Sequence, residues 1–201
     1  GMCRYHLSDY HHAIAAYREA SPIWEQLQAA GNQVLNMSGW TLMLLGESQL
    51  ALGEMQEAAV SFSESASFYE RYRQGGGSVK EWHFGTAFCL SGLGHVYART
   101  GEKQRALDTL AEAMGHYNSA GEDYYSSRLL NQTGEVYASL GEYGRALTLY
   151  DQALQLEQNQ GNPAAEAQTL FLMGQSQQAT GAPNKAQQYF ERALDIRRGI
   201  G

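Results

Sequence analysis

The chain has 201 residues, of which 43% are hydrophobic, and it carries a formal net charge of −7. A hydrophobic content of this size argues against intrinsic disorder. The acidic balance, without a basic face or stripe, argues against a nucleic-acid partner. No apolar run approaches the roughly 18 residues that would suggest a membrane span, and no signal peptide is present. We therefore expect a soluble, cytoplasmic protein with no membrane partner.

Apolar residues recur at helical spacing along the whole chain, and no segment alternates strictly enough to indicate a strand. Glycines interrupt the pattern at intervals, and Gly31-Asn32, Gly121 and Gly161-Asn162 are the kind of residue that ends a helix in a left-handed conformation. The sequence thus predicts an all-α fold of nine helices, at 9–30, 33–52, 55–73, 79–100, 103–119, 123–140, 143–160, 163–180 and 183–198.

A ladder of small and large residues repeats four times at fixed offsets, with starting glycines 48, 40 and 40 residues apart. Each copy has a glycine, a second glycine seven residues on, then an alanine and a large apolar residue. The four copies are Gly46, Gly53, Ala58, Phe62; Gly94, Gly101, Ala106, Leu110; Gly134, Gly141, Ala146, Tyr150; and Gly174, Gly181, Ala186, Phe190. A half-copy with Ala13, Tyr17 and Ala20 opens the chain. Self-similarity of this kind indicates stacked helix pairs.

The first glycine of each copy lies inside a predicted helix, where glycine costs about 1 kcal/mol relative to alanine. Close approach of the partner helix would explain its presence. We expect the alanines to form the opposite wall and the large residues to fill the gap towards the next pair.

The segment GEVYASLGEYGRALTLYDQAL (134–154) shows the ladder most clearly and resembles a tetratricopeptide repeat. The standard repeat has about 34 residues, and the longer spacing here is similar to that of kinesin light chains and many bacterial regulators. The resemblance implies a right-handed α–α superhelix of antiparallel helices. We expect one solenoid domain over 2–201, as a fragment of a larger protein, with a half repeat at 2–32 and repeats at 33–77, 78–121, 122–161 and 162–201.

In the family that the chain resembles, the first helix of each unit lines a concave groove that takes a peptide or a partner helix. Residues at the corresponding offsets share one stripe on each helix, because their i, i+3, i+7 spacing keeps them on one side. These candidate groove residues are Trp40, Met43, Glu47, Phe88, Ser91, His95, Arg99, Arg128, Asn131, Glu135, Gln168, Phe171 and Gln175. The alternative is that they face solvent or pack between repeats.

Within the stripe we expect Trp40, Phe88 and Phe171 to act as apolar anchors, and Arg99, Arg128 and Asn131 as polar clamps. Family members that clamp the acidic tails of chaperones use lysine and asparagine. No lysine lies in the stripe, and asparagine never follows the repeat glycine. A carboxylate clamp of that kind is therefore not expected.

The longer first spacing places eight extra residues between Phe68 and Phe84, around Gly75, Gly76 and Gly77. An aromatic-flanked loop is a candidate for recognition. We favour the alternative, a connector whose aromatic residues pack back on neighbouring helices.

Motifs for catalysis and for metal binding are absent from the sequence, including GxSxG, a phosphate loop and HExxH. We expect no enzymatic activity, no cofactor and no metal. The leading hypothesis is a scaffold that binds a protein or peptide in its groove. A peptide- or ligand-sensing segment of a bacterial signalling or transcription protein is the first alternative. The second is self-assembly, such as a homodimer, through uncapped solenoid ends.

Overall fold

The computed structural model describes residues 9–29, 35–121 and 123–200, and within these ranges it contains nine α-helices and no strand. The helices are α2 (Tyr10–Ala29), α3 (Leu35–Leu52), α4 (Met55–Gln74), α5 (Val79–Thr100), α6 (Lys103–Ala120), α7 (Asp123–Ser139), α8 (Tyr143–Gln160), α9 (Pro163–Ala179) and α10 (Pro183–Ile200). Every end lies within two residues of its predicted position, so the prediction from helical periodicity is confirmed.

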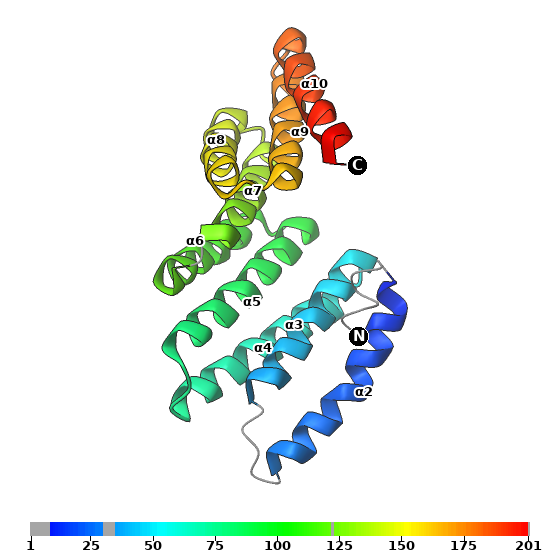
Figure 1. Cartoon of the computed structure of the whole chain (residues 1–201), viewed down its shortest axis with the longest axis vertical. Coiled ribbons are helices and arrows are strands. Elements are labelled where there is room, and N and C mark those ends of the chain that lie inside the picture. The colour runs from blue at the N-terminus through cyan, green and yellow to red at the C-terminus, as the bar shows by residue number, and fades with distance from the viewer. Residues whose placement is uncertain (1–8, 30–34, 122, 201) are drawn as a thin grey trace. The chain divides into compact units, whose positions relative to one another are not determined.

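The chain divides into two compact units, residues 1–120 and 121–201. In unit 1, helices α2 to α6 each pack against the next helix, and α3 also contacts α5 (Figure 1). In unit 2, helices α7 to α10 pack in the same order, and α7 also contacts α9. Contacts between neighbours and between every second helix are typical of stacked helix pairs. That the two units form a single solenoid domain stays a prediction.

The large residues of the ladder lie directly on its glycines. A Cβ atom added to Gly134 would be 2.4 Å from the ring of Tyr150, and one added to Gly94 would be 2.6 Å from the side chain of Leu110. We expected these large residues to point towards the next pair, but each occupies the space over the glycine of its own pair. Phe62 does both, since its ring also lies 2.4 Å from the position of a Cβ on Gly92.

Left-handed glycines end the second helix of a pair, as predicted. Gly121 has φ of +70° and Gly161 has φ of +63°, and the Gly161 amide donates to the carbonyl of Gln158 at 3.2 Å. The predicted stop at Gly31-Asn32 lies outside the described residues.

The longer first spacing lengthens two helices instead of making a long loop. Helix α4 has 20 residues and α5 has 22, which leaves only residues 75–78 as the connection. The aromatic residues beside it pack on the helices: the Tyr72 hydroxyl donates to Glu81, and the Arg73 guanidinium lies 4.8 Å from the ring centre of Trp82. The favoured interpretation of a packed connector is confirmed.

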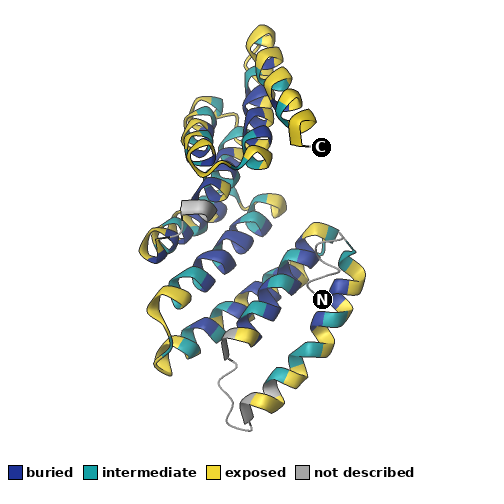
Figure 2. Cartoon of the chain, in the orientation of Figure 1, coloured by how far each residue is buried: buried dark blue, intermediate teal, exposed yellow. Residues whose placement is uncertain are grey.

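Each unit has its own hydrophobic core on the facing sides of neighbouring helices (Figure 2). In unit 1 the buried cluster includes Ala13, Ile14, Tyr17, Leu42 and Leu45; in unit 2 it is Ala146, Tyr150, Leu170, Leu172, Met173 and Ala193. The clusters combine ladder residues with the leucines and methionines around them, so the repeat pattern accounts for the packing.

Candidate functional site

Seven of the predicted groove residues lie in unit 1, and the core holds three of them. Met43 is fully buried, and Phe88 and Ser91 are also buried. Their interpretation as groove-facing side chains is therefore corrected: they pack between helices and present little surface to a ligand. Phe88, in particular, lies with its ring 6.4 Å from that of Phe84 on the same helix and is no exposed anchor.

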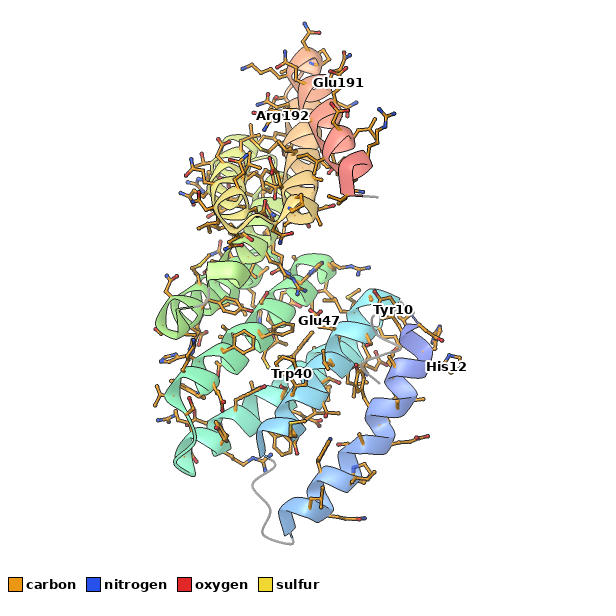
Figure 3. All side chains as sticks on the ribbon, in the orientation of Figure 1. Tyr10, His12, Trp40, Glu47, Glu191 and Arg192 are labelled. Carbon is orange, nitrogen blue, oxygen red and sulfur yellow. The ribbon has the colours of Figure 1, made fainter. Side chains whose placement is uncertain are left out.

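Trp40 and Glu47 project from α3 and are half-buried (Figure 3). The Trp40 ring stacks on Phe84 of α5, with centroids 6.3 Å apart and planes 19° from parallel. This contact joins the first helices of two successive pairs. Trp40 thus fits the inter-repeat alternative as well as a role at a surface.

Arg99 is exposed, but its guanidinium already has an acceptor. It donates to the carbonyl of Leu50 at 3.1 Å, in the last turn of α3. A cation at this end of a helix is stabilised by the unpaired carbonyls and by the helix dipole. Arg99 therefore ties α5 to α3, and its proposed role as a clamp must compete with this contact.

In unit 2, four of the predicted residues meet at one pocket of about 420 Å³. They are Glu135 of α7 and Gln168, Phe171 and Gln175 of α9. Tyr143 and Tyr150 of α8 contribute aromatic rings, and the wall is completed by Ala138, Leu172 and Ser176. The volume lies within the range of about 300–1,000 Å³ that is typical of ligand sites. The first helices of two successive pairs thus supply one pocket.

Asn131 lies below this surface in a buried polar network. Its side-chain amide donates to Thr169 Oγ1 at 2.6 Å and to Glu157 Oε1 at 3.2 Å. Thr169 in turn donates to the other carboxylate oxygen of Glu157, at 2.7 Å. These bonds join α7, α8 and α9, so the expectation that Asn131 clamps a ligand is corrected to a structural role. Arg128, which precedes it, is exposed.

Glu157 is a buried carboxylate at a position where the two preceding repeats carry Tyr117 and Tyr69. Burial raises the pKa of Glu157, while hydrogen bonds from Thr169, Ser127 and Asn131 lower it in part. The sequence register shows the exchange of tyrosine for glutamate. It does not show which donors surround the carboxylate, because Ser127, Asn131 and Thr169 come from two other helices.

Glu135 has the most distinctive electrostatic setting in the pocket. Part of its side chain is exposed, yet the neighbouring helices crowd it, and this burial raises the pKa of the Glu135 carboxyl. The same crowding raises the pKa of Tyr150, and the Glu135 charge adds to that shift. A raised pKa indicates that hydrogen bonds and nearby positive charges do not offset the loss of water around the carboxylate.

A histidine pair in unit 1 was not predicted from the sequence. His83 of α5 and His116 of α6 place their Nδ1 atoms 3.0 Å apart, beside the ring of Trp82. Burial and the neighbouring His83 lower the pKa of His116, and Glu112 opposes the shift. The two histidines are 33 residues apart, and only the offset between paired helices could have brought them together.

Metal ligands do not cluster in the part of the chain that the structure describes: no group of three or more histidine, cysteine, aspartate or glutamate side chains could hold an ion there. Among the described helices, none combines the length and the apolar character that crossing a membrane requires. The expected absence of a cofactor stays a prediction.

The fold belongs to the class of helical-repeat proteins. Its helices pack in pairs, a glycine lies under a large side chain in each ladder copy, and alternate helices are in contact within each unit. Residues 125–199 match the tetratricopeptide-repeat family model. This match lies in the unit that holds the pocket and confirms the resemblance read from residues 134–154. No protein of curated function matches the chain in sequence.

Solved structures extend the likeness of fold over nearly the whole chain. BtubC (BKLC) from P. vanneervenii is 22% identical with a TM-score of 0.74, and the match covers 98% of this chain and 76% of that one. The Rap conjugation gene regulator of plasmid pLS20, solved in complex with a Phr peptide, is 16% identical with a TM-score of 0.83 over 100% of this chain. This chain spans 52% of that Rap protein.

A putative kinesin light chain from Podosopora anserina with nearly identical TPR-like repeats is 15% identical, with a TM-score of 0.62 over 99% of this chain and 95% of that one. At these identities the likeness shows the fold alone. The predicted all-α class of helical-repeat solenoids is confirmed, and so is its similarity to kinesin light chains and bacterial regulators.

Proposed function

We propose that the protein is a non-enzymatic scaffold that binds an extended peptide or a segment of a protein partner at the pocket of unit 2. The observation that carries this proposal is the pocket itself, where Glu135 of α7 and five residues of α9 converge on one surface. They come from the first helices of successive repeats, which line the binding groove in the family that residues 125–199 match.

The composition of the pocket suits a peptide. Phe171 is 41% exposed and provides an apolar contact, while Gln168 and Gln175 offer amide groups that both donate and accept hydrogen bonds. Aromatic anchors bordered by polar groups are typical of binding surfaces.

The role of Phe171 provides the test. A Phe171→Ala variant should lose at least tenfold in affinity for peptides that the unchanged protein selects from a displayed random library, since truncating an aromatic hot-spot residue costs about 2 kcal/mol or more. The matched control is Leu140→Ala, because Leu140 lies in the same unit, is 43% exposed and is not part of the pocket. If circular dichroism shows that both variants are folded and both bind the peptides equally well, the pocket is not the binding site.

A peptide-sensing role within a larger regulator is the second candidate. It is supported by the TM-score of 0.83 to a Rap regulator whose structure contains a peptide, although this chain spans only about half of that protein. A sensing role requires that peptide binding changes the arrangement of the helices. Small-angle scattering of the protein with and without a selected peptide would test it, and identical curves would leave only the scaffold function.

Self-assembly through the helix-pair ends also stays a proposal. An apolar hollow of about 340 Å³ lies between α9 and α10, with Phe190 and Leu194 in its wall. Leu194 is 47% exposed. Light scattering over a range of concentrations would detect association, and a constant monomer mass would exclude it.

A further inference from the structure

The pocket of unit 2 carries a single carboxylate, which bears on the kind of peptide that it accepts. Among its lining residues, Glu135 is the only aspartate, glutamate, lysine, arginine or histidine. The remaining polar groups are two glutamine amides, two tyrosines and Ser176. The inference below rests on the proposed peptide-binding function and concerns the chemical class of the ligand.

The Glu135 carboxylate has no hydrogen-bond or ion-pair partner within the part of unit 2 that the structure describes, whereas several other carboxylates of the unit do. Arg145 pairs with Glu142 at 2.8 Å, and Gln158 donates to Glu166 at 3.0 Å. One turn away from Glu135 on α7 stand Asn131, Gln132, Ala138 and Ser139, none of which is basic. Unit 2 therefore places a carboxylate at the pocket, and no cation is among the residues that line it.

Two arginines of unit 2 illustrate this. Arg197 of α10 donates to the side-chain carbonyl of Gln168 at 3.0 Å, on the far helix of the pocket from Glu135. Arg128 precedes Glu135 by seven residues, which is about 10 Å along the helix axis. Within the described part of unit 2, neither arginine is positioned as a counter-ion for Glu135, so a ligand could supply one.

Aromatic rings beside the carboxylate favour the same kind of ligand. Phe171 and Tyr143 line the pocket, and a cation over an aromatic face is stabilised by the ring quadrupole. The chain already uses this contact, since Arg105 lies 3.9 Å from the ring centre of Tyr97 and Arg145 lies 5.4 Å from that of Tyr137. A guanidinium or ammonium group in the pocket would have both a counter-ion and an aromatic wall.

We propose that the pocket accommodates an arginine or lysine side chain of the bound peptide, with Glu135 as its counter-ion and Phe171 and Tyr143 as the rings beside its aliphatic stem. Gln175 is in place to accept a further hydrogen bond from a guanidinium through its side-chain carbonyl. This assignment is opposite in charge to a clamp for acidic tails.

The test uses synthetic peptide pools in which one central residue is fixed and the flanking positions are randomised. Their binding to the full chain is measured by fluorescence polarisation. The arginine and lysine pools should bind about tenfold or more tightly than the glutamine and glutamate pools, as expected for a hydrogen bond to a charged group. Glu135→Gln should abolish this preference.

Asp151→Asn is the matched control. Asp151 lies on the neighbouring helix α8, is exposed and is outside the pocket, and its substitution changes the net charge by the same amount. This variant should keep the preference for basic pools. As a measurement independent of any variant, added salt should weaken the basic pools more than the glutamine pool.

The outcomes separate this inference from the proposed function. If the unchanged protein binds all pools alike and Phe171→Ala weakens them all, the peptide site stands and the basic specificity is wrong. If the preference exists but survives in Glu135→Gln, or is lost equally in Asp151→Asn, the role of Glu135 is wrong. If no pool binds, both proposals fail.

Discussion

Gly134→Ala tests whether the glycine ladder exists to make room for the large side chain of the same pair. In α7 the new methyl group would lie 2.4 Å from the ring of Tyr150, whereas ordinary contacts begin at 3.4 Å. Tyr150 is fully buried, and its hydroxyl is hydrogen-bonded to Ser176. The hydrogen bond opposes rotation of the ring away from the new methyl group.

Two opposing effects set the size of the change. Replacing glycine by alanine inside a helix stabilises by about 1 kcal/mol. Overpacking a well-filled core costs about 1–3 kcal/mol, and the short distance and fixed ring favour the upper end. We expect a net loss of about 2 kcal/mol in the free energy of unfolding. Urea denaturation followed by far-ultraviolet circular dichroism measures this directly.

Gly115→Ala provides the control, because Gly115 lies inside α6 and a Cβ there would meet nothing within 4 Å. This variant should gain up to about 1 kcal/mol from helix propensity alone. In a Tyr150→Leu background, the alanine at position 134 should cost less, since the smaller side chain leaves room. The reasoning is refuted if Gly134→Ala is as stabilising as Gly115→Ala.

Two further predictions concern pH. Burial raises the pKa of Glu157 above its ordinary value of 4.5, so its contribution to stability is present at low pH and is lost as pH rises from 4.5 through the raised value. Over this range Glu157→Gln should therefore gain stability relative to the unchanged protein, as measured by urea unfolding. The effect is contradicted if the difference in the free energy of unfolding between the two proteins is the same at all pH values. Burial lowers the pKa of His116 below 6.5, so its contribution to stability is present above pH 6.5 and is lost as pH falls through the lowered value. Thermal melts between pH 7.5 and 5 should show that His116→Gln loses less stability than the unchanged protein. An equal loss in both proteins would rule out this role of His116.

The helices and their pairing follow from sequence because both are local. Hydrophobic periodicity places every helix end within two residues, and the offset from Gly134 to Tyr150 pairs α7 with α8. Of the predicted groove residues, Glu135, Gln168, Phe171 and Gln175 line one pocket, and their role in binding stays a prediction. Helical spacing alone could not show that Asn131, on the same stripe, faces inward.

Accessibility within the stripe depends on which neighbouring helix covers a position. Asn131 is covered because Thr169 of α9 and Glu157 of α8 meet its amide, whereas Phe171, at the equivalent position of the next repeat, stays 41% exposed. The histidine pair likewise depends on the packing of α5 against α6.

By itself, the sequence determined the all-α class, the helix boundaries and the repeat register, since these depend on spacing along one chain and on small residues at fixed offsets. The tertiary structure decided which polar groups form hydrogen bonds inside the protein and which remain available to a ligand. The Asn131 amide donates to Glu157 in the core, while Glu135 lines a pocket in which no other lining residue carries a formal charge. The physical reason is that burial and hydrogen-bond partners are set by side chains from other helices, whose distances no spacing in the sequence specifies.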